Sequence, residues 1–464
     1  MKIYNTLSRQ IEEFIPNEEG KVKIYTCGPT VYSYPHIGNM RSYIGHDILD
    51  KTLRYLGYQV TRVMNITDIG HLSDEGDYGD DKMVEAAKKQ KKSVLDIARY
   101  YTDVFFEDFV ALNNKVPEHV SPATNHIDEY IKIIEVLIEK GYAYVAGGNV
   151  YFDTSKLTNY YQLTNQNEEE LAVAVREGVE EDSNKKNRTD FVLWFTKSKF
   201  DDQELKWESP WGSGYPGWHI ECTAICAKYF GEYVDIHGGG VDNIFPHHTN
   251  EIAQSEAYFG HKWCNYWFHN EHLLDESGKM SKSEGAISTV PLLIQKGYNP
   301  LSYRYMCLGS HYRKQLVFSY ENLNGAENAY LKLKNKISLI NDKGHLSEGD
   351  FANYNAKFIE ALEDDLNTAN ALTLLYDLLK DEMVNGHTKL ALIESFDKVL
   401  SLDLLKKSGK HQDHDDIMIL IDARDKAKKE ENYELADSIR DELLTKGIQL
   451  VDSREGTTYK IIGE

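Results

Sequence analysis

A strand, a helix and a second strand follow one another near the N-terminus, and this order constrains the fold more than any other feature. Residues 21–27 (KVKIYTC) alternate between the two sides, as a short strand does. Apolar residues then recur at helical spacing from Met40 to Leu56, and residues 59–66 form a second strand. Such a βαβ unit predicts a parallel sheet with helices on its faces. The turn at residues 28–39 is a natural phosphate site, because unpaired amides and the helix dipole favour negative charge there.

Two short motifs indicate ATP chemistry. HIGN at residues 36–39 ends that turn, and KMSKS follows far downstream at residues 279–283. Lys279 and Lys282 lie between glycines, which suits a loop that moves onto phosphates and neutralises them. A solvated basic loop is the alternative for KMSKS alone, but the two motifs together favour a nucleotide-dependent enzyme.

Length and composition favour a globular protein of about two to four domains. The chain has 464 residues, of which 41% are hydrophobic and 27% are charged. No apolar run reaches the roughly 18 residues of a membrane span, and the first residues lack the segments of a signal peptide. We therefore expect a cytoplasmic location. The five cysteines, an odd number, argue against a disulfide framework and leave thiols for metal binding or catalysis.

The net charge of −22 gives the protein no overall basic field for nucleic acid. RNA could still bind through a local patch such as Lys88, Lys89, Lys91 and Lys92. A solvated helix face explains this lysine run equally well.

The predicted elements divide the chain into five segments. These are the first half of a Rossmann-like α/β catalytic domain at 1–115, an α+β connective insertion at 116–205, the second half of the catalytic domain at 206–290, a linker and helical bundle at 291–405, and a linker with a small C-terminal module at 406–464. In the second half we expect a strand that ends in glycines at 232–240 and a helix at 246–259. In the bundle we expect amphipathic helical runs at 320–341, 351–381 and 388–405.

The candidate metal ligands are two cysteines, a histidine and a glutamate. His247 and Glu251 are four residues apart on a predicted helix, so both side chains leave the same face and can reach one ion. Cys27 ends the first strand and Cys222 lies in another helical stretch, which together make a plausible zinc site. Cys226, one helical turn from Cys222, could replace it. The alternative is that each cysteine is a small buried apolar residue.

At these residues the chain resembles the cysteinyl-tRNA synthetases, which are class I aminoacyl-tRNA synthetases. The likeness runs nearly end to end and rests on CGPTVYSYPHIGN at 27–39, NITDIG at 65–70, DFVLWF at 190–195, SPWGSGYPGWHIEC at 209–222, DIHGGGVDNIFPHHTNEIAQSE at 235–256, KMSKS, and EDDLNTANAL at 363–372.

The resemblance implies ATP-dependent ligation of L-cysteine to the 3′ end of tRNA(Cys) through a cysteinyl adenylate. It also implies one zinc ion per chain held by Cys27, Cys222, His247 and Glu251, which decides against Cys226. Zinc would bind the substrate sulfur as a thiolate and so reject serine, which a hydrophobic pocket does poorly. Mg²⁺ is expected with the ATP.

The family roles carry over residue by residue. The ATP-binding positions would be His36, Gly38, Asn39, Asp242 and Lys282, with His36, Asn39, Lys279 and Lys282 acting on the phosphates and Asp242 facing the ribose. The cysteine pocket would include Cys27, Thr67, Trp218 and His237, although packing or capping also explains Thr67. Tyr433 could stack on an anticodon base, and the alternative for it is ordinary helix packing.

Three positions depart from the family pattern. Asn39 stands where relatives often have histidine, and it cannot carry a positive charge. Tyr215 and Thr249 stand where relatives often show Arg and Glu. We therefore expect weaker phosphate stabilisation at Asn39, and any contact that those two charges make in relatives is missing here or supplied elsewhere.

Two other functions compete with tRNA charging. A related ligase that joins cysteine to a sugar amine shares the adenylation half but has no anticodon to recognise. A noncatalytic zinc and nucleotide binding protein is the second alternative, and the intact lysines and ligands argue against it. The expected form is a monomer that binds tRNA(Cys), ATP and L-cysteine and no membrane.

Overall fold

The computed structural model describes residues 1–69, 82–164, 182–197, 205–275, 278–279, 288–406, 420–421, 423–428, 432–445, 448–453 and 456–461. The chain forms two compact units. The first consists of Met1–Leu331 and Asn341–Leu402, and the second of Lys332–Ile340 and Asp403–Glu464. Among the described residues, no helix combines the length and the apolar character that crossing a membrane requires.

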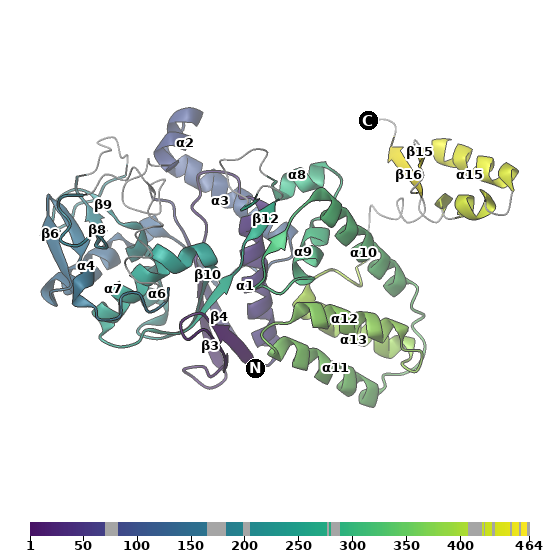
Figure 1. Cartoon of the computed structure of the whole chain (residues 1–464), viewed down its shortest axis with the longest axis horizontal. Helices are drawn as coiled ribbons and strands as arrows, with labels where there is room; N and C mark the ends of the chain where they lie inside the picture. The colour runs from purple at the N-terminus through teal and green to yellow at the C-terminus, as the bar shows by residue number, and fades with distance from the viewer. Residues whose placement is uncertain are drawn as a thin grey trace. The chain divides into compact units, whose positions relative to one another are not determined.

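The first unit is built on a five-stranded parallel sheet in the order β11-β10-β3-β4-β5, of which β3, β4 and β10 are labelled in Figure 1. The strands are β3 (Lys21–Thr26), β4 (Gln59–Ile66), β5 (His119–Pro122), β10 (Val234–Gly240) and β11 (Cys264–Asn270). Helix α1 (Ile37–Tyr55) connects β3 to β4. This arrangement confirms the Rossmann-like parallel sheet that the sequence predicts, and α1 begins at Ile37 rather than at Met40.

The order of the strands reverses between β3 and β10. From β3 the chain proceeds to β4 and β5 on one side, and it later returns to add β10 and β11 on the other. Ile24 and Thr26 of β3 lie opposite Ile236 and Gly238 of β10. In open parallel sheets, ligands bind beyond the carboxyl ends of the strands at such a reversal. The turn at residues 28–39 and the glycines of β10 both lie there.

The insertion between β5 and β10 has the mixed helix and strand composition that the sequence predicts. It contains α4 (Ile127–Glu139) and an antiparallel sheet of β6 (Ala143–Ala146), β7 (Asn149–Phe152), β8 (Phe191–Phe195) and β9 (Tyr215–Pro216). Its apolar side chains share one core with α6 (Trp218–Phe230) and α7 (Thr249–Phe259) of the catalytic domain. The insertion therefore packs directly behind the helices that carry the candidate ligands.

Helices follow the second half of the sheet. They are α8 (Val290–Gln295), α9 (Pro300–Leu308), α10 (Tyr320–Ser338), α11 (Glu348–Glu363), α12 (Thr368–Lys380) and α13 (Gly386–Leu400), and the last three lie side by side (Figure 1). Small strands β12 (Leu273–Asp275), β13 (Gly278–Lys279) and β14 (Leu316–Val317) precede or separate them. A further pair, β1 (Lys2–Asn5) and β2 (Gln10–Glu13), forms an N-terminal hairpin.

Two predicted helix spans were wrong. The run at 351–381 is two helices, because Asp365 and Leu366 adopt left-handed backbone conformations between α11 and α12. The Asp365 carboxylate accepts hydrogen bonds from Tyr4 N and Tyr312 Oη, and these tertiary contacts stabilise the break. The helix expected at 246–259 begins only at Thr249, because a wider turn over Ile244–His248 precedes it.

A fully buried arginine fixes α1 against the helical bundle. Arg304 of α9 donates from Nη2 to Asp47 Oδ2 of α1 at 2.7 Å and from Nε to the carbonyl of Leu400 in α13 at 2.7 Å. Its Nη1 donates to Asn114 Oδ1 at 2.9 Å. Removing one partner of such a buried pair costs about 3–5 kcal/mol, so this contact holds the helix that follows the phosphate turn in place.

The second unit contains α15 (Tyr433–Thr445) and a hairpin of β15 (Ile448–Ser453) and β16 (Gly456–Ile461). Its small core joins Ile421, Ile439, Leu443 and Ile448. The five segment boundaries predicted from the sequence stay a prediction.

Candidate active site

The structure brings the four predicted metal ligands together at the reversal of strand order. We call Cys27, Cys222, His247 and Glu251 the ligand cluster. The Sγ atoms of Cys27 and Cys222 are 4.0 Å apart, Cys222 Sγ is 3.5 Å from His247 Nε2, and His247 Nε2 is 2.9 Å from Glu251 Oε1. One ligand atom from each residue lies within 4.8 Å of the others. Two sulfurs, a nitrogen and an oxygen at this spacing form a donor set that suits zinc.

Two further histidines border the cluster. His248 Nε2 lies 3.2 Å from Cys27 Sγ, and His237 Nε2 lies 2.9 Å from Glu251 Oε2. With Cys27 and Glu251 they form an overlapping set of possible ligands. The sequence predicts His237 for the cysteine pocket but does not single out His248. The signal was the spacing of three residues between His248 and Glu251, which also places two side chains on one helical face.

Cys226 lies outside both sets of possible ligands among the described residues. It is fully buried in an apolar cluster with Cys264, Trp263 and Ile225. Cys264 and Cys307 are 2% and 7% exposed and therefore also lie in the core.

The electrostatics of the cluster suit a cation. Burial raises the pKa of the Cys27 and Cys222 thiols. Burial also disfavours the charge on Glu251, but the imidazoles of His237 and His247 outweigh it and lower the pKa of Glu251 to about 2. The carboxylate is therefore charged at neutral pH, whereas the thiols keep their protons until a cation displaces them.

The hydrogen bonding within the cluster also suits a metal ion. Glu251 is fully buried, and its Oε1 makes no hydrogen bond of good geometry among the described residues, although His247 Nε2 lies 2.9 Å from it. Nδ1 of His247 lies 3.0 Å from Nδ1 of His219, which orients the ring so that Nε2 faces the cluster. A buried carboxylate oxygen without a well-formed hydrogen bond, next to an oriented imidazole nitrogen, fits a metal ion better than an apolar core does.

The residues predicted for the cysteine pocket lie around the cluster. The Trp218 ring stacks on that of His247 with the centroids 4.2 Å apart, and His237 is fully buried against Glu251. Thr67 Oγ1 donates to Glu221 Oε2 at 2.9 Å, and burial raises the pKa of Glu221 to about 8. The sequence did not single out Glu221. Cys27 is the one ligand that is not fully buried, so access to the cluster is on its side.

The nucleotide turn, residues 28–39, ends in a reciprocal cap of α1. Nδ1 of His36 accepts from the backbone N–H of Asn39 at 3.1 Å, and Asn39 Oδ1 accepts from the N–H of His36 at 3.3 Å. A Cβ at Gly38 would come within 2.9 Å of His36 Nδ1, so a larger residue there would force the His36 ring to move. Asn39 thus has a structural task as a capping residue at the position where relatives often have histidine.

The other residues predicted to bind the nucleotide lie partly outside the described residues. Asp242, which is 45% exposed, follows β10 and has Oδ1 3.5 Å from Nε2 of His272, a neighbour that the sequence did not single out. The backbone of Lys279 pairs with Leu274 in the small sheet, and its side chain lies outside the described residues. Lys282 lies outside them altogether. Tyr433 is 63% exposed at the start of α15.

The two other departures from the family pattern have structural partners. The ring of Tyr215 is buried and stacks on Phe195 with the centroids 5.0 Å apart. Thr249 Oγ1 donates to the carbonyl of Ile244 at 2.7 Å at the start of α7. Both side chains therefore support local structure where charges are often found in relatives.

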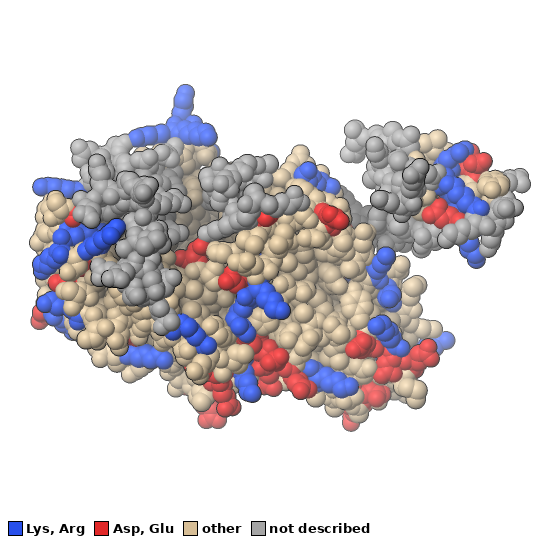
Figure 2. All heavy atoms as spheres, viewed as in Figure 1, with Lys and Arg blue, Asp and Glu red and all other residues tan. Residues whose placement is uncertain are grey.

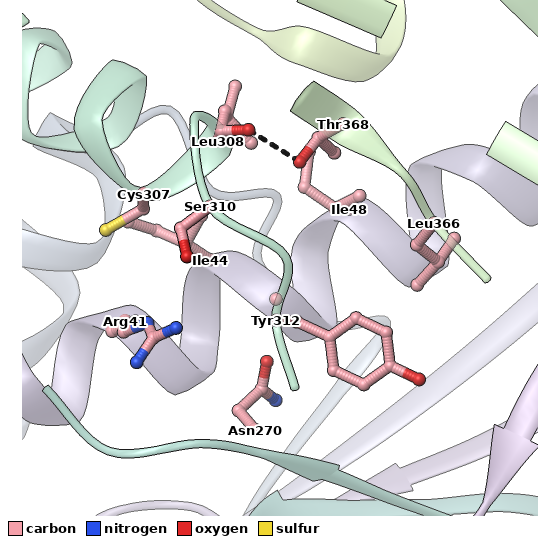
Figure 3. A pocket seen from close by; sticks show the side chains of 11 residues that line it. Arg41, Ile44, Ile48, Asn270, Cys307, Leu308, Ser310, Tyr312, Leu366 and Thr368 are labelled. Atoms are coloured by element: carbon pink, nitrogen blue, oxygen red, sulfur yellow. Dashed lines mark hydrogen bonds between the residues drawn. The ribbon is translucent and has the colours of Figure 1, made fainter. Parts of the chain in front are cut away.

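A cavity of about 30 Å³ lies between α1, α9 and the start of α12 (Figure 3). Asn270 on its wall has a buried Nδ2 without a partner among the described residues, whereas Thr368 Oγ1 donates to the carbonyl of Leu308 at 2.8 Å. The space suits about one water molecule. No lining residue belongs to the ligand cluster, so this cavity is not the substrate site.

Comparison with known families places this fold and site in one class. Residues 13–328 match the family described as tRNA synthetases class I (C) catalytic domain, and residues 357–404 match the DALR domain. The first match covers well over half of the chain. The protein is therefore a class I aminoacyl-tRNA synthetase.

Curated relatives narrow the class further. The chain is 47% identical to the cysteine–tRNA ligase of Treponema denticola and 43% identical to that of Borreliella burgdorferi, in each case over 99% of both chains. The chain belongs to the cysteine–tRNA ligase family. Among solved structures, it resembles Mycobacterium tuberculosis methionyl-tRNA synthetase bound by methionyl-adenylate, with a TM-score of 0.56 at 15% identity over 84% of this chain and 95% of that one. This last likeness concerns the fold alone.

Proposed function

We propose that the protein ligates L-cysteine to the 3′ end of tRNA(Cys) in two steps, at the expense of ATP. The carboxylate of cysteine attacks the α-phosphate, which releases pyrophosphate and forms cysteinyl adenylate. A hydroxyl of the terminal ribose of the tRNA then attacks the activated carbonyl and releases AMP. The observation that carries this proposal is the position of the ligand cluster, which lies where β3 ends and the nucleotide turn begins.

In this proposal Cys27, Cys222, His247 and Glu251 hold one zinc ion. The bound ion supplies a preference for a thiolate over the hydroxyl of serine. His219 orients His247, and the charged Glu251 balances part of the positive charge. Trp218 and His237 would wall the side-chain pocket, and Thr67 would position Glu221 behind it. Because Cys222, His237, His247 and Glu251 are buried, the pocket would select its substrate where competing water is scarce.

The nucleotide turn would bind the triphosphate. Since Nδ1 of His36 accepts from Asn39 N, a neutral His36 carries its proton on Nε2, where it can donate to a phosphate oxygen. Gly38 would add its backbone N–H at the start of α1, and Asn39, whose own N–H is donated to His36, would hold the His36 ring in place. Lys279 and Lys282 would neutralise the phosphates together with Mg²⁺, and Asp242 would accept from the ribose hydroxyls.

The helical bundle and the second unit would bind the tRNA. The match of residues 357–404 to the DALR domain and the names of the relatives support tRNA over a sugar amine as the acceptor. Tyr433 is exposed enough to stack on an unpaired base. We further propose that the protein works as a monomer in the cytoplasm.

A two-stage assay tests the proposal. The first stage measures cysteine-dependent exchange of labelled pyrophosphate into ATP, with serine as the matched control substrate. The second stage measures charging of a tRNA(Cys) transcript. We expect exchange with cysteine only, and then charging. Exchange with transfer to a sugar amine instead of tRNA would favour the related ligase, and nucleotide binding without exchange would favour the noncatalytic protein.

A further inference from the structure

Exposed tyrosine and lysine side chains form a corner beside the nucleotide turn. The corner consists of Tyr34, Tyr100, Lys91 and Lys92. Tyr34 and Tyr100 are 44% and 41% exposed, and their hydroxyl oxygens are 2.8 Å apart. Their rings meet edge to face at 6.4 Å, and Lys92 Nζ lies 5.2 Å from the centroid of the Tyr100 ring. Two large rings that share one hydrogen bond and still face solvent offer a π surface next to cationic groups.

The corner is fixed to the nucleotide turn by a shared apolar core. Helices α2 (Lys82–Gln90) and α3 (Val94–Ala111) form a hairpin, and side chains of both pack on Val31 of the turn. Lys91 adopts a left-handed backbone conformation with φ of 54°, and Lys92 N donates to the carbonyl of Ala87 at 3.1 Å. The lysines therefore project from a tight turn between two packed helices.

Local charge at the corner opposes the charge of the whole protein. The net charge is −22, yet Lys88, Lys89, Lys91 and Lys92 fall within five consecutive residues and all are exposed. Basic side chains gather at the top of the space-filling view, over α2 (Figure 2). On an acidic protein, such a cluster attracts a polyanion to one place instead of to the surface at large.

We propose that the corner binds the unpaired nucleotides at the 3′ end of the tRNA and directs them toward the nucleotide turn. This inference rests on the proposed function. Single-stranded RNA is bound by aromatic rings that stack on bases and by cations that meet the phosphates, and the corner offers both. Tyr34 lies two residues before His36, so an RNA end that stacks here lies next to the predicted site of the adenylate.

The test combines direct RNA binding with charging. Tyr100→Ala removes the ring, Tyr100→Phe keeps the ring without its hydroxyl, and a Lys91→Ala, Lys92→Ala double variant removes the charge. Tyr233→Ala is the matched control, because Tyr233 is 47% exposed and stacks on His261 away from the corner. Binding is measured with a complete tRNA(Cys) transcript and with one that lacks its unpaired 3′ nucleotides.

We expect Tyr100→Ala to weaken binding of the complete transcript about tenfold and Tyr100→Phe to weaken it little. The double variant should also bind more weakly. The slope of log affinity against log salt concentration should become less steep by about one to two, because two phosphate contacts are lost. Neither change should alter binding of the shortened transcript or pyrophosphate exchange, and the KM for tRNA in charging should rise in parallel.

Three outcomes would overturn the inference. These are unchanged binding of the complete transcript by both variants, equal weakening for both transcripts, and an equal effect of Tyr233→Ala. If wild-type protein charges tRNA while the variants match it, the corner is not an RNA site and the proposed function stands. If wild-type protein exchanges pyrophosphate but neither binds nor charges tRNA(Cys), the RNA site and the proposed acceptor fail together.

Discussion

The ligand cluster and the nucleotide turn meet at Cys27, which directly precedes the turn, but they differ in exposure. Cys222, His247 and Glu251 are at most 1% exposed, whereas Asn39 is exposed and His36 is partly so. A site that separates a thiol from a hydroxyl must remove water and fix its donors in advance. A site that grips a triphosphate must admit a large charged ligand and let pyrophosphate leave. Under the proposed function, selection of cysteine and activation by ATP would therefore take place in two different structural environments.

The sharpest test of this division is Cys222→Ser. Because the hydroxyl is a poor zinc ligand, we expect metal content after dialysis to fall from about one ion per chain to near zero. Cysteine-dependent exchange should fall by at least about 100-fold, and preference over serine should erode. Cys226→Ser, one helical turn away on the same helix, is the control and should keep its metal. Equal metal loss in both variants would contradict the assigned cluster.

Lys282→Ala tests the phosphate-binding part of the site rather than the ligand cluster. Removing a cation that stabilises phosphate charge in the transition state should lower kcat for exchange about 100-fold. Metal content should not change, because no lysine belongs to the ligand cluster. Metal analysis and exchange kinetics on the same preparation check both statements. A fall in metal content would show that the two environments are coupled.

Two substitutions of Asn39 separate its capping role from a role in phosphate binding. Asn39→Ala loses the acceptor for His36 N and should destabilise the start of α1 by about 0.5–2 kcal/mol. Asn39→Asp keeps an acceptor, so thermal stability should be maintained, but its charge should raise the KM for ATP about fivefold. Melting temperatures and ATP kinetics of both variants give the answer. If Asn39→Asp leaves the KM unchanged, this side chain is remote from the phosphates.

The smallest expected effect lies in α3, below the tyrosine and lysine corner. Burial raises the pKa of Asp108 to about 7, and the charge of Glu107 adds to this shift. An unfolded aspartate titrates near pH 4, so the folded chain binds an extra proton between about pH 4 and 7. Stability contributed by this group is therefore lost as pH rises through that window.

Asp108→Asn should remove this pH dependence. We expect its melting temperature to exceed that of the wild type by roughly 1–4 °C at pH 8 and to match it at pH 4. Thermal unfolding at both pH values checks the difference. An offset of equal size at both would show that Asp108 does not titrate in this window.

Regular elements near the N-terminus could be predicted from sequence because local pattern and tertiary environment agree there. The second strand has the predicted bounds of 59–66, since it is buried on both faces and ends in turns. The break between α11 and α12 could not be predicted. It depends on hydrogen bonds that reach Asp365 from Tyr4 and Tyr312, both distant in sequence.

The candidate site could also be predicted only in part from the sequence. His247 and Glu251 followed from their helical spacing, but the choice of Cys222 over Cys226 needed either a known family or the structure. Both cysteines are buried, and only packing decides that Cys222 faces His247 while Cys226 faces Cys264. His248 was missed because its contact with Cys27 depends on the pairing of β3 with β10.

The ligand cluster can form only after more than half of the chain has been synthesised. Cys27 emerges from the ribosome more than two hundred residues before Glu251, and the first strand cannot meet β10 until the insertion has been made. At about 5–20 residues per second, the first thiol waits roughly ten seconds to most of a minute for its last partner. During that time it is an unprotected nascent cysteine, open to oxidants and stray metals. Zinc loading would therefore report that translation has passed the middle of the protein.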